Sequence, residues 1–586
     1  MRGSVPDSLE QALTARTDLD QYGSSKRLLF ALQIAFGIED IHTVATTALT
    51  DGPDDKKCDA VLVDQASARA VIAQSYEAAT TTTRVAAPAN KAADLNTAIT
   101  WMLGQDLSDI PEHLRPAARE LHEALEADEI NTFEIWYCHN LPESKAVEEE
   151  LQAATVTVRR LLNERFPRSN VESVVGSEVG RGTLETWYRG TQVPILVSDQ
   201  FALQVSGCFE EAGDKWSAVC ASVPAAWLHE LFKEYQSDLF SANVREYLGS
   251  RKTTRNINNN IKETAREQPG RFWAYNNGMT ALVNTYTIQD GGRQLTIDGI
   301  AIVNGAQTTG ALGHVEAANI GNARVLARFV KCDDPAVIRE IIRFNNSQNQ
   351  IETADFRSND NVQKRLRDEF AEMGDVAYSG ARRGGAEDVI RRPGDNMIPS
   401  STAAQALAAF HQEPDLAYNQ KSRLWESDQL YGRFFSEDTT AAHLLFTYSL
   451  LRAIESAKRQ LQAKEESQRT QSEQQRVDFF RQRGSTFLLL AAIGSCAEIY
   501  LDRVIPDPFR LHFGAGTTLA KAVELWSPMV APALALSQSL TGALERNLRN
   551  RERVSEALTN FRSLFEATKA GNAELFASFA RHVEVG

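Results

Sequence analysis

The chain has 586 residues, enough for roughly two to four domains, and its 43% apolar and 24% charged residues are typical of globular proteins. It shows no apolar run of about 18 residues and no signal peptide, so we expect a cytoplasmic protein without membrane contact. The net charge of −15 argues against non-specific coating of nucleic acid. Six scattered cysteines without a C-x-x-C pair argue against structural zinc and a disulfide framework.

The first part of the chain is predicted to begin with helix over residues 1–50. Two short apolar runs follow, Ala60–Val63 and Ala70–Ala73, and the polar turn between them predicts an antiparallel pair of strands. Beyond them we expect helix, strand, helix and strand in turn, over residues 89–127, 132–138, 144–164 and 171–175. This order predicts one α/β domain over residues 1–178.

Polar side chains flank the predicted strand pair, with Asp59 at the start of the first strand and Gln74 at the end of the second. This arrangement resembles the metal-binding motif of PD-(D/E)xK nucleases of the Mrr type. The resemblance implies that Asp59 and Gln74 hold Mg²⁺ (or Mn²⁺), which polarises the scissile phosphate, and that Glu39 contributes to catalysis. Tyr76 stands where those nucleases carry a lysine, and Lys91 on the next predicted helix is a candidate substitute. Two interpretations of this domain therefore remain, an active nuclease and an inactive scaffold.

Strand-like runs dominate residues 179–230, among them LETWY at 184–188 and KWSAVCASV at 215–223. A helix is predicted for Ala225–Phe240. A strand at Asn322–Val330 and a helix at Pro335–Phe344 follow. We expect an α+β domain over residues 179–437.

Two Asn-Gly pairs mark the centre of this domain. Asn277-Gly278 lies between the strand-like runs Phe272–Tyr275 and 279–283, which predicts a hairpin. The second pair, Asn304-Gly305, lies between a predicted strand, Gly299–Val303, and a predicted helix. Such a turn suits an anion such as phosphate, although two ordinary turns would carry the same sequence.

Amide and small polar residues cluster around these turns. Asn and Gln offer both a donor and an acceptor, so they either read a polar ligand or satisfy irregular backbone. The candidate ligand-binding residues are Asn276, Asn277, Asn304, Gly305, Gln307, Thr308, Asn345, Asn346 and Gln348.

Basic residues gather in two segments of the same domain. Residues 251–271 hold six basic and two acidic side chains, and Arg251, Lys252 and Arg255 are candidates for phosphate contact. Arg382 and Arg383 lie in a glycine-rich loop and are similar candidates. A solvated helix face and a solvated loop are the alternative interpretations.

Four sequence segments resemble the motifs of a known family: NVREYLG at 243–249, FWAYNNGMT at 272–280, IVNGAQTTGAL at 302–312 and FNNSQNQI at 344–351. In this order they resemble successive motifs of the AIPR family, the abortive-infection phage-resistance proteins of bacteria. Many AIPR proteins carry an Mrr-like nuclease domain at the N-terminus. The resemblance implies a role in defence against phage.

The remaining chain, residues 438–586, is predicted to form a helical domain. Within it, residues 455–484 are charged and polar with few apolar anchors, which predicts an exposed helical arm.

We therefore expect a multidomain α/β protein with an N-terminal restriction-endonuclease-like domain, a central α+β domain and a helical C-terminal region. The favoured function is anti-phage defence by metal-dependent cleavage of nucleic acid. The alternative is a non-enzymatic sensor of nucleic acid or a nucleotide, built on an inactive nuclease fold. We expect DNA rather than RNA as the partner, and a homodimer.

Overall fold

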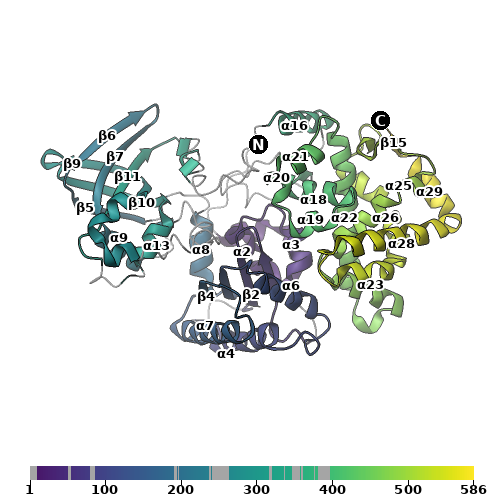
Figure 1. The fold of residues 1–586 in the computed structure, drawn as a ribbon, viewed down its shortest axis with the longest axis horizontal. Coiled ribbons are helices and arrows are strands. Elements are labelled where there is room, and N and C mark those ends of the chain that lie inside the picture. The colour runs from purple at the N-terminus through teal and green to yellow at the C-terminus, as the bar shows by residue number, and fades with distance from the viewer. Residues whose placement is uncertain are drawn as a thin grey trace.

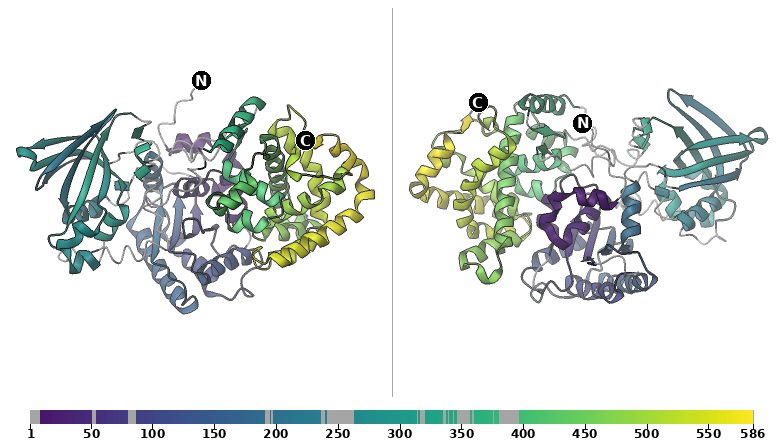
Figure 2. Two further views of the ribbon diagram at one scale, coloured as in Figure 1. Left: turned by 45° about the horizontal axis from the view of Figure 1, so that its top comes forward. Right: turned by 180° about the vertical axis from the view of Figure 1, so that it is seen from behind.

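A computed structural model gives the structure of the protein. It describes residues 9–50, 54–79, 86–190, 195, 197–235, 239–240, 263–313, 315, 320–334, 337–338, 340–342, 344–345, 357, 360–374, 376–379 and 396–585. Three parts are evident in Figure 1: an N-terminal domain (residues 9–190), a central domain built on a large sheet (residues 195–345) and a helical region (residues 360–585). The N-terminal domain touches the helical region, and Figure 2 shows the central sheet at the opposite end of the molecule.

The N-terminal domain is organised around a four-stranded sheet of order β1-β2-β3-β4. Strand β1 pairs antiparallel with β2, as predicted, while β2, β3 and β4 run parallel. The strands are β1 Ala60–Asp64, β2 Arg69–Tyr76, β3 Thr132–His139 and β4 Ser173–Val179. Because helices cover both faces, β2 and β3 are almost wholly buried.

Side chains alternate between the two faces of this sheet. Val61, Ile72 and Ile135 belong to one apolar core, and Ala60, Val71 and Trp136 belong to the other. The first face is covered by α4 Ala89–Ala93, α5 Leu95–Ile99, α6 Arg115–Glu126 and α7 Lys145–Arg165. The second is covered by α1 Leu9–Ala15, α2 Lys26–Phe36, α3 Ile41–Ala48 and α8 Arg181–Gly190.

Helix α8 corrects one prediction. The run LETWY was expected to be a strand, but it forms the middle of this helix. Leu184, Trp187 and Tyr188 pack into the core beside α2, which gives them helical rather than alternating spacing. The N-terminal domain therefore extends to residue 190, beyond the expected end at 178.

The central domain holds a seven-stranded mixed sheet of order β5-β10-β8-β11-β7-β6, with β9 paired to β10. Helices α9 Ala225–Tyr235 and α13 Ala306–Gly313 contact each other over one face. The strands are β5 Val197–Gln204, β6 Cys208–Gly213, β7 Trp216–Pro224, β8 Met279–Val283, β9 Thr285–Gln289, β10 Gln294–Asn304 and β11 Arg324–Cys332.

The predicted hairpin at Asn277-Gly278 is wrong. Residues Phe272–Tyr275 form the short helix α12, because Pro269 opens a helical turn that runs directly into it. The backbone then enters β8 through Gly278, which has a φ of +82°. A Cβ there would overlap the Leu326 carbonyl oxygen, so only glycine fits.

The helical region shares one apolar core that runs from Leu366 to Val583. Helices therefore begin well before the expected boundary at 438. They include α16 Asn361–Met373, α18 Ser400–Phe410, α19 Pro414–Asn419, α21 Asp428–Phe434, α22 Ala441–Ala463, α23 Gln471–Arg481, α24 Ser485–Ser495, α25 Ala497–Leu501, α26 Leu519–Ala535, α28 Arg551–Ala567 and α29 Ala573–Ala580. Within the described ranges, no single helix has the length and apolar composition needed to cross a membrane, although two sharply bent helix pairs pass on those criteria.

Helix α22 joins the helical region to the N-terminal domain through buried charges. The Arg452 guanidinium pairs with Asp40 and, at 2.5 Å, with Glu455, and both carboxylates are almost inaccessible to solvent. The Thr43 hydroxyl donates to Glu455 at 2.9 Å, and the Thr402 hydroxyl donates to Asp40 at 3.1 Å. Burial raises the pKa of Asp40, but the Arg452 charge outweighs it and leaves that pKa below its usual value.

This contact corrects the predicted exposed arm at 455–484 at its two ends, whereas residues 460–475 are largely exposed, as predicted. Glu455, Lys458 and Arg483 are buried, because the N-terminal domain covers them. The Lys458 ammonium donates to the Thr46 carbonyl at 2.5 Å, and Arg483 pairs with Glu120 of α6 at 3.2 Å. The charge pattern predicted exposure to solvent throughout, but at the two ends of the stretch these three charged side chains face another domain.

Lys458 gives this contact a pH dependence. Burial, reinforced by the nearby Arg483 and opposed by Glu455, lowers the pKa of Lys458 from 10.5 to about 7. The unfolded chain therefore binds the proton more readily between these values, so folding becomes more favourable as the pH rises. Relative to Lys458→Met, the wild-type free energy of unfolding is expected to gain up to about 1.4 kcal/mol per pH unit above pH 7, measured by urea denaturation.

The exposed Lys521 on α26 supplies the control. Lys521→Met and the wild type should keep a constant difference across the same pH series. If the free energies of unfolding of Lys458→Met and wild type changed with pH in parallel, the buried-lysine explanation would be contradicted.

Candidate functional site

The carboxyl ends of the parallel strands bring four polar side chains into one row across the N-terminal sheet. Gln74 of β2 lies opposite Tyr137 of β3, and Tyr137 lies opposite Glu178 of β4. Ala60 pairs with Ala73, so extending that register by one residue places Asp59 opposite Gln74. Alternation puts Gln74 on the side of Ile72, the face covered by α4 to α7. The predicted pair Asp59 and Gln74 is therefore brought together.

Gln74 has an unusual environment. The residue is only 6% exposed, and its side-chain oxygen Oε1 has no hydrogen-bond partner among the described residues. A buried amide oxygen without a partner costs about 1–3 kcal/mol. Beside it, one Asp59 carboxylate oxygen accepts from the Ser75 amide at 2.6 Å and from the Ser75 hydroxyl at 3.0 Å. The two predicted ligands thus differ, since Asp59 is held by the backbone and Gln74 lacks a partner for its oxygen.

The rest of the row is held by hydrogen bonds. The Tyr137 hydroxyl donates to the Pro88 carbonyl at 3.4 Å, which places the start of α4 at this edge. Burial raises the pKa of Tyr137, and Tyr76 and Glu178 add to this effect, so the phenol stays protonated. Glu178 accepts from His139 Nε2 at 3.0 Å and from the Ser144 amide at 3.0 Å.

Sequence reasoning missed Tyr137, His139 and Glu178, although a signal existed. Each lies at or near the end of a parallel strand, and the carboxyl ends of such strands meet at one edge. Lys91, the candidate substitute for the missing lysine, lies on α4 and pairs with Asp94 at 3.7 Å.

Glu39, the third predicted catalytic residue, is engaged elsewhere. Its carboxylate accepts from the Ser401 hydroxyl at 2.8 Å, in the contact with the helical region. Across the part of the chain that the structure describes, no group of three or more His, Cys, Asp or Glu side chains is arranged to hold a metal ion. A cation at Asp59 and Gln74 would need water or substrate oxygens to complete its ligands.

A second candidate site lies in the central domain, where two glycine turns pack against each other. We call Gly278 and Gly305, with their neighbours, the paired glycine turns. Gly305 connects β10 to α13, as predicted, and has a φ of +93°. A Cβ there would lie 2.9 Å from the Gly278 carbonyl oxygen and 2.8 Å from Met279 Cβ.

The amides predicted to read a ligand largely hold this backbone in place. The Asn276 side-chain oxygen accepts from the Gly278 amide at 3.0 Å and from the Thr308 hydroxyl at 3.1 Å. Asn304 Nδ2 donates to the Asn345 carbonyl at 2.8 Å. The amides were expected either to read a polar ligand or to satisfy irregular backbone, and these hydrogen bonds fit the second interpretation for the three asparagines. Asn277 is exposed and Gln307 is half-buried, so these two are better placed to meet a ligand.

Arg328 was missed by the sequence analysis. It lies on β11 beside Thr280 of β8, donates to the Thr280 hydroxyl at 3.0 Å and reaches the Asn345 side-chain oxygen at 3.2 Å. An arginine among strand residues gave no signal, because its role depends on the pairing of β11 with β8. The predicted residues Arg251, Lys252, Arg255, Asn346, Gln348, Arg382 and Arg383 lie outside the described residues.

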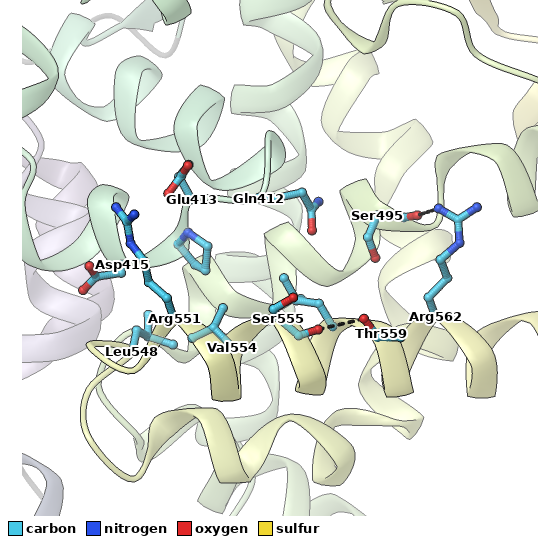
Figure 3. Close-up of a pocket in the computed structure, with 12 residues that line it drawn as sticks. Gln412, Glu413, Asp415, Ser495, Leu548, Arg551, Val554, Ser555, Thr559 and Arg562 are labelled. Carbon is cyan, nitrogen blue, oxygen red and sulfur yellow. Dashed lines mark hydrogen bonds between the residues drawn. The ribbon is translucent and has the colours of Figure 1, made fainter. Parts of the chain in front are cut away.

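A pocket of about 370 Å³ lies in the helical region (Figure 3). Several of its polar groups already have partners: Arg562 donates to the Ser495 carbonyl at 2.7 Å, and Glu413 accepts from Arg433 at 2.7 Å. Asp415 accepts from Asn419 at 2.7 Å and from Gln420 at 2.6 Å. We therefore assign no ligand to this pocket.

Comparison with known proteins identifies a family. A family model described as AIPR protein matches residues 240–570. Neither a curated protein sequence nor a solved structure shows a significant match to the chain.

Gly305 can be tested by substitution. Gly305→Ala is expected to lower the free energy of unfolding by about 1–3 kcal/mol, because the new Cβ meets backbone atoms and φ is positive. Gly310→Ala in α13 is the matched control. Among the described residues a Cβ there meets only Phe232, at 3.9 Å, and alanine favours helix, so stability should stay equal or rise by up to about 1 kcal/mol. Equal urea midpoints for Gly305→Ala and wild type would show that the turns can separate.

Proposed function

Because the chain belongs to the AIPR family, whose model covers more than half of it, we propose that it acts on nucleic acid in defence against phage. The family itself points to abortive infection as the setting. The N-terminal domain lies outside the matched residues, so its role is argued from its own geometry. We propose that this domain cleaves nucleic acid with the help of a divalent cation held by Asp59 and Gln74.

One observation carries this proposal: Gln74 has a buried oxygen that lacks a hydrogen-bond partner among the described residues, and the register of β1 and β2, extended by one residue, places Gln74 opposite Asp59. Protein interiors rarely leave such an atom unpaired unless an ion, a water or a function accounts for it. Amide and carboxylate oxygens are suitable ligands for Mg²⁺, which commonly uses one or two carboxylates together with water and phosphate oxygens. The residues present therefore fit such a cation.

When bound, Mg²⁺ or Mn²⁺ would polarise the scissile phosphate and lower the pKa of a bound water. The chain's own residues would hold and orient the reactants. The Ser75 amide and hydroxyl fix Asp59, and protonated Tyr137 can donate but cannot act as a base. Lys91, on the helix that starts at this edge, is the candidate to supply the positive charge that Tyr76 does not.

A second function rests on the paired glycine turns. There the N-terminal domain would be an inactive scaffold, and the turn at Gly305 would bind a nucleotide or the end of a nucleic acid. Helix α13 starts directly after Gly305. The first amide groups of a helix have no partner within the helix itself, which suits a phosphate. Gln307 would contact the ligand, so Gln307→Ala should weaken binding without loss of stability.

The metal site can be tested by charge removal. Asp59→Asn keeps the size and an acceptor for Ser75 but loses the negative charge. It is expected to abolish Mn²⁺ binding in calorimetry and Mn²⁺-dependent cleavage of DNA. Ser75→Ala is the control, since it loses only the 3.0 Å contact to Asp59 and keeps both proposed ligands. Full phage protection by Asp59→Asn would overturn the nuclease proposal.

Gln74 allows an independent test by stability. Gln74→Met keeps the volume of the side chain and removes the unpaired oxygen, so in EDTA we expect the variant to be more stable by about 1–3 kcal/mol. Mn²⁺ should stabilise the wild type but not the variant. A variant that is less stable than wild type in EDTA would show that the oxygen has a partner in the metal-free protein.

A further inference from the structure

A tyrosine, a histidine and an aspartate form a hydrogen-bonded series near the start of the N-terminal domain. Tyr22 and Asp18 belong to the 3₁₀ helix η1 Thr17–Ser25, and His42 is the second residue of α3. The Tyr22 hydroxyl lies 3.0 Å from His42 Nδ1, and His42 Nε2 lies 3.1 Å from an Asp18 carboxylate oxygen. The imidazole therefore lies between a phenol and a carboxylate.

The hydrogen bonds fix the positions of the protons in this series. Arg16 donates to the two Asp18 oxygens at 2.9 Å and 2.8 Å. Burial raises the pKa of Asp18, but the hydrogen bonds from His42 and Arg16 outweigh it and leave that pKa well below its usual value. Asp18 is therefore an anion, and the His42 Nε2–H donates to it. In the neutral imidazole Nδ1 then carries no proton, so it accepts from the Tyr22 hydroxyl.

This order of groups is typical of an activated nucleophile. Burial raises the pKa of Tyr22, so its hydroxyl needs a base before it can attack a substrate at neutral pH. His42 is within hydrogen-bond reach to take the proton, while Asp18 orients the imidazole and stabilises the positive charge that it gains. A hydroxyl, a base and a third group that orients the base are the arrangement by which catalytic nucleophiles are recognised.

Arg459 supplies positive charge near the tyrosine. It lies on α22 one turn after Glu455, whose carboxylate accepts from Thr43, the residue that follows His42. The charge of Arg459 acts on Tyr22, where it opposes the effect of burial on the pKa. Arg459 is half-buried and forms no hydrogen bond or ion pair within the described part of the chain. A guanidinium in this state suits the oxygens of a phosphate.

The hydrogen-bonded series lies at the surface of the N-terminal domain rather than in its core. Tyr22 is half-buried, and its neighbours Gln21 and Gly23 are both exposed. The side chains of His42 and Asp18 are 23% and 12% exposed.

We propose that Tyr22 is a nucleophile that attacks the phosphorus of a phosphate ester or anhydride, with His42 as its base. Asp18 is the positioning residue, and Arg459 contacts the phosphate. The Tyr22 oxygen forms a bond to phosphorus while the bond from phosphorus to the leaving oxygen breaks. The Tyr22 proton passes to His42 Nδ1 and from there to the leaving oxygen, so the product is a phosphotyrosine ester. This activity is additional to the proposed nuclease and does not depend on it.

The test uses the full chain in Mg²⁺ with three radiolabelled probes, because a nucleotide and a nucleic acid share this chemistry. ATP labelled at the α-phosphate reports nucleotidyl transfer, and ATP labelled at the γ-phosphate reports phosphoryl transfer. A single-stranded oligonucleotide labelled at internal phosphates reports attack on a phosphodiester. We expect one probe to leave label on the denatured protein. Mass spectrometry should then place the added group on the tryptic peptide of residues 17–26, in which Tyr22 is the only tyrosine.

Three variants separate catalysis from a structural role. Tyr22→Phe keeps the ring and should remove the label. His42→Gln can accept from Tyr22 and donate to Asp18 but cannot take a proton, so labelling should slow by about 10²–10⁴-fold. Tyr275→Phe changes an exposed tyrosine of the central domain and should be labelled as the wild type is. Melting temperatures show whether each variant is folded.

The proposal is overturned if none of the three probes labels the wild type, or if Tyr22→Phe or His42→Gln is labelled as fast as the wild type. A structural role alone predicts lower melting temperatures for the variants without any label on the wild type. Asp59→Asn should be labelled normally, so failure of the nuclease proposal is seen separately.

Discussion

The position of the N-terminal domain depends on the buried charge of Arg452. The Arg452 guanidinium is 19% exposed and pairs with two carboxylates that are almost inaccessible to solvent, Asp40 and Glu455, which come from two different parts of the fold. Removal of one partner from such a group typically costs about 3–5 kcal/mol, because the remaining charge stays buried and unpaired. The contact therefore holds in one arrangement, and a shifted docking of the two parts would leave a charge without its partner.

The same contact is joined to the candidate metal site by a short stretch of backbone. Helix α3 carries Thr43 and Thr46 into the contact and ends two residues before Thr50. The Thr50 amide donates to the Asp59 carbonyl at 3.0 Å, so the start of β1 is fixed to the end of α3. The residue that would hold the cation thus sits on backbone that the interdomain contact keeps in place.

Much of the N-terminal domain could be predicted, because its strands and helices are local patterns of buried and exposed residues. The pairing of Asp59 with Gln74 followed from the two runs at β1 and β2. Long-range effects could not be seen in this way. Phe272–Tyr275 carries residues typical of a strand, but Pro269 and the crowded site of Gly278 decide its conformation. The two ends of the stretch at 455–484 were expected to be exposed because their partners, Thr43, Thr46 and Glu120, lie far away in the sequence.

The distance along the chain between Asp40 and Arg452 also affects how the protein forms on the ribosome. The two residues are 412 positions apart. From residue 190, where the N-terminal domain ends, 262 residues remain to Arg452, so at about 5–20 residues per second that domain would be complete for roughly 13–52 s before its partner residue is made. During that interval Asp40 and the exposed side of α3 would face water, where a charged carboxylate costs little. This surface is polar, with threonines in place of large apolar side chains. We therefore expect the nascent domain to stay soluble until its partner helix is made.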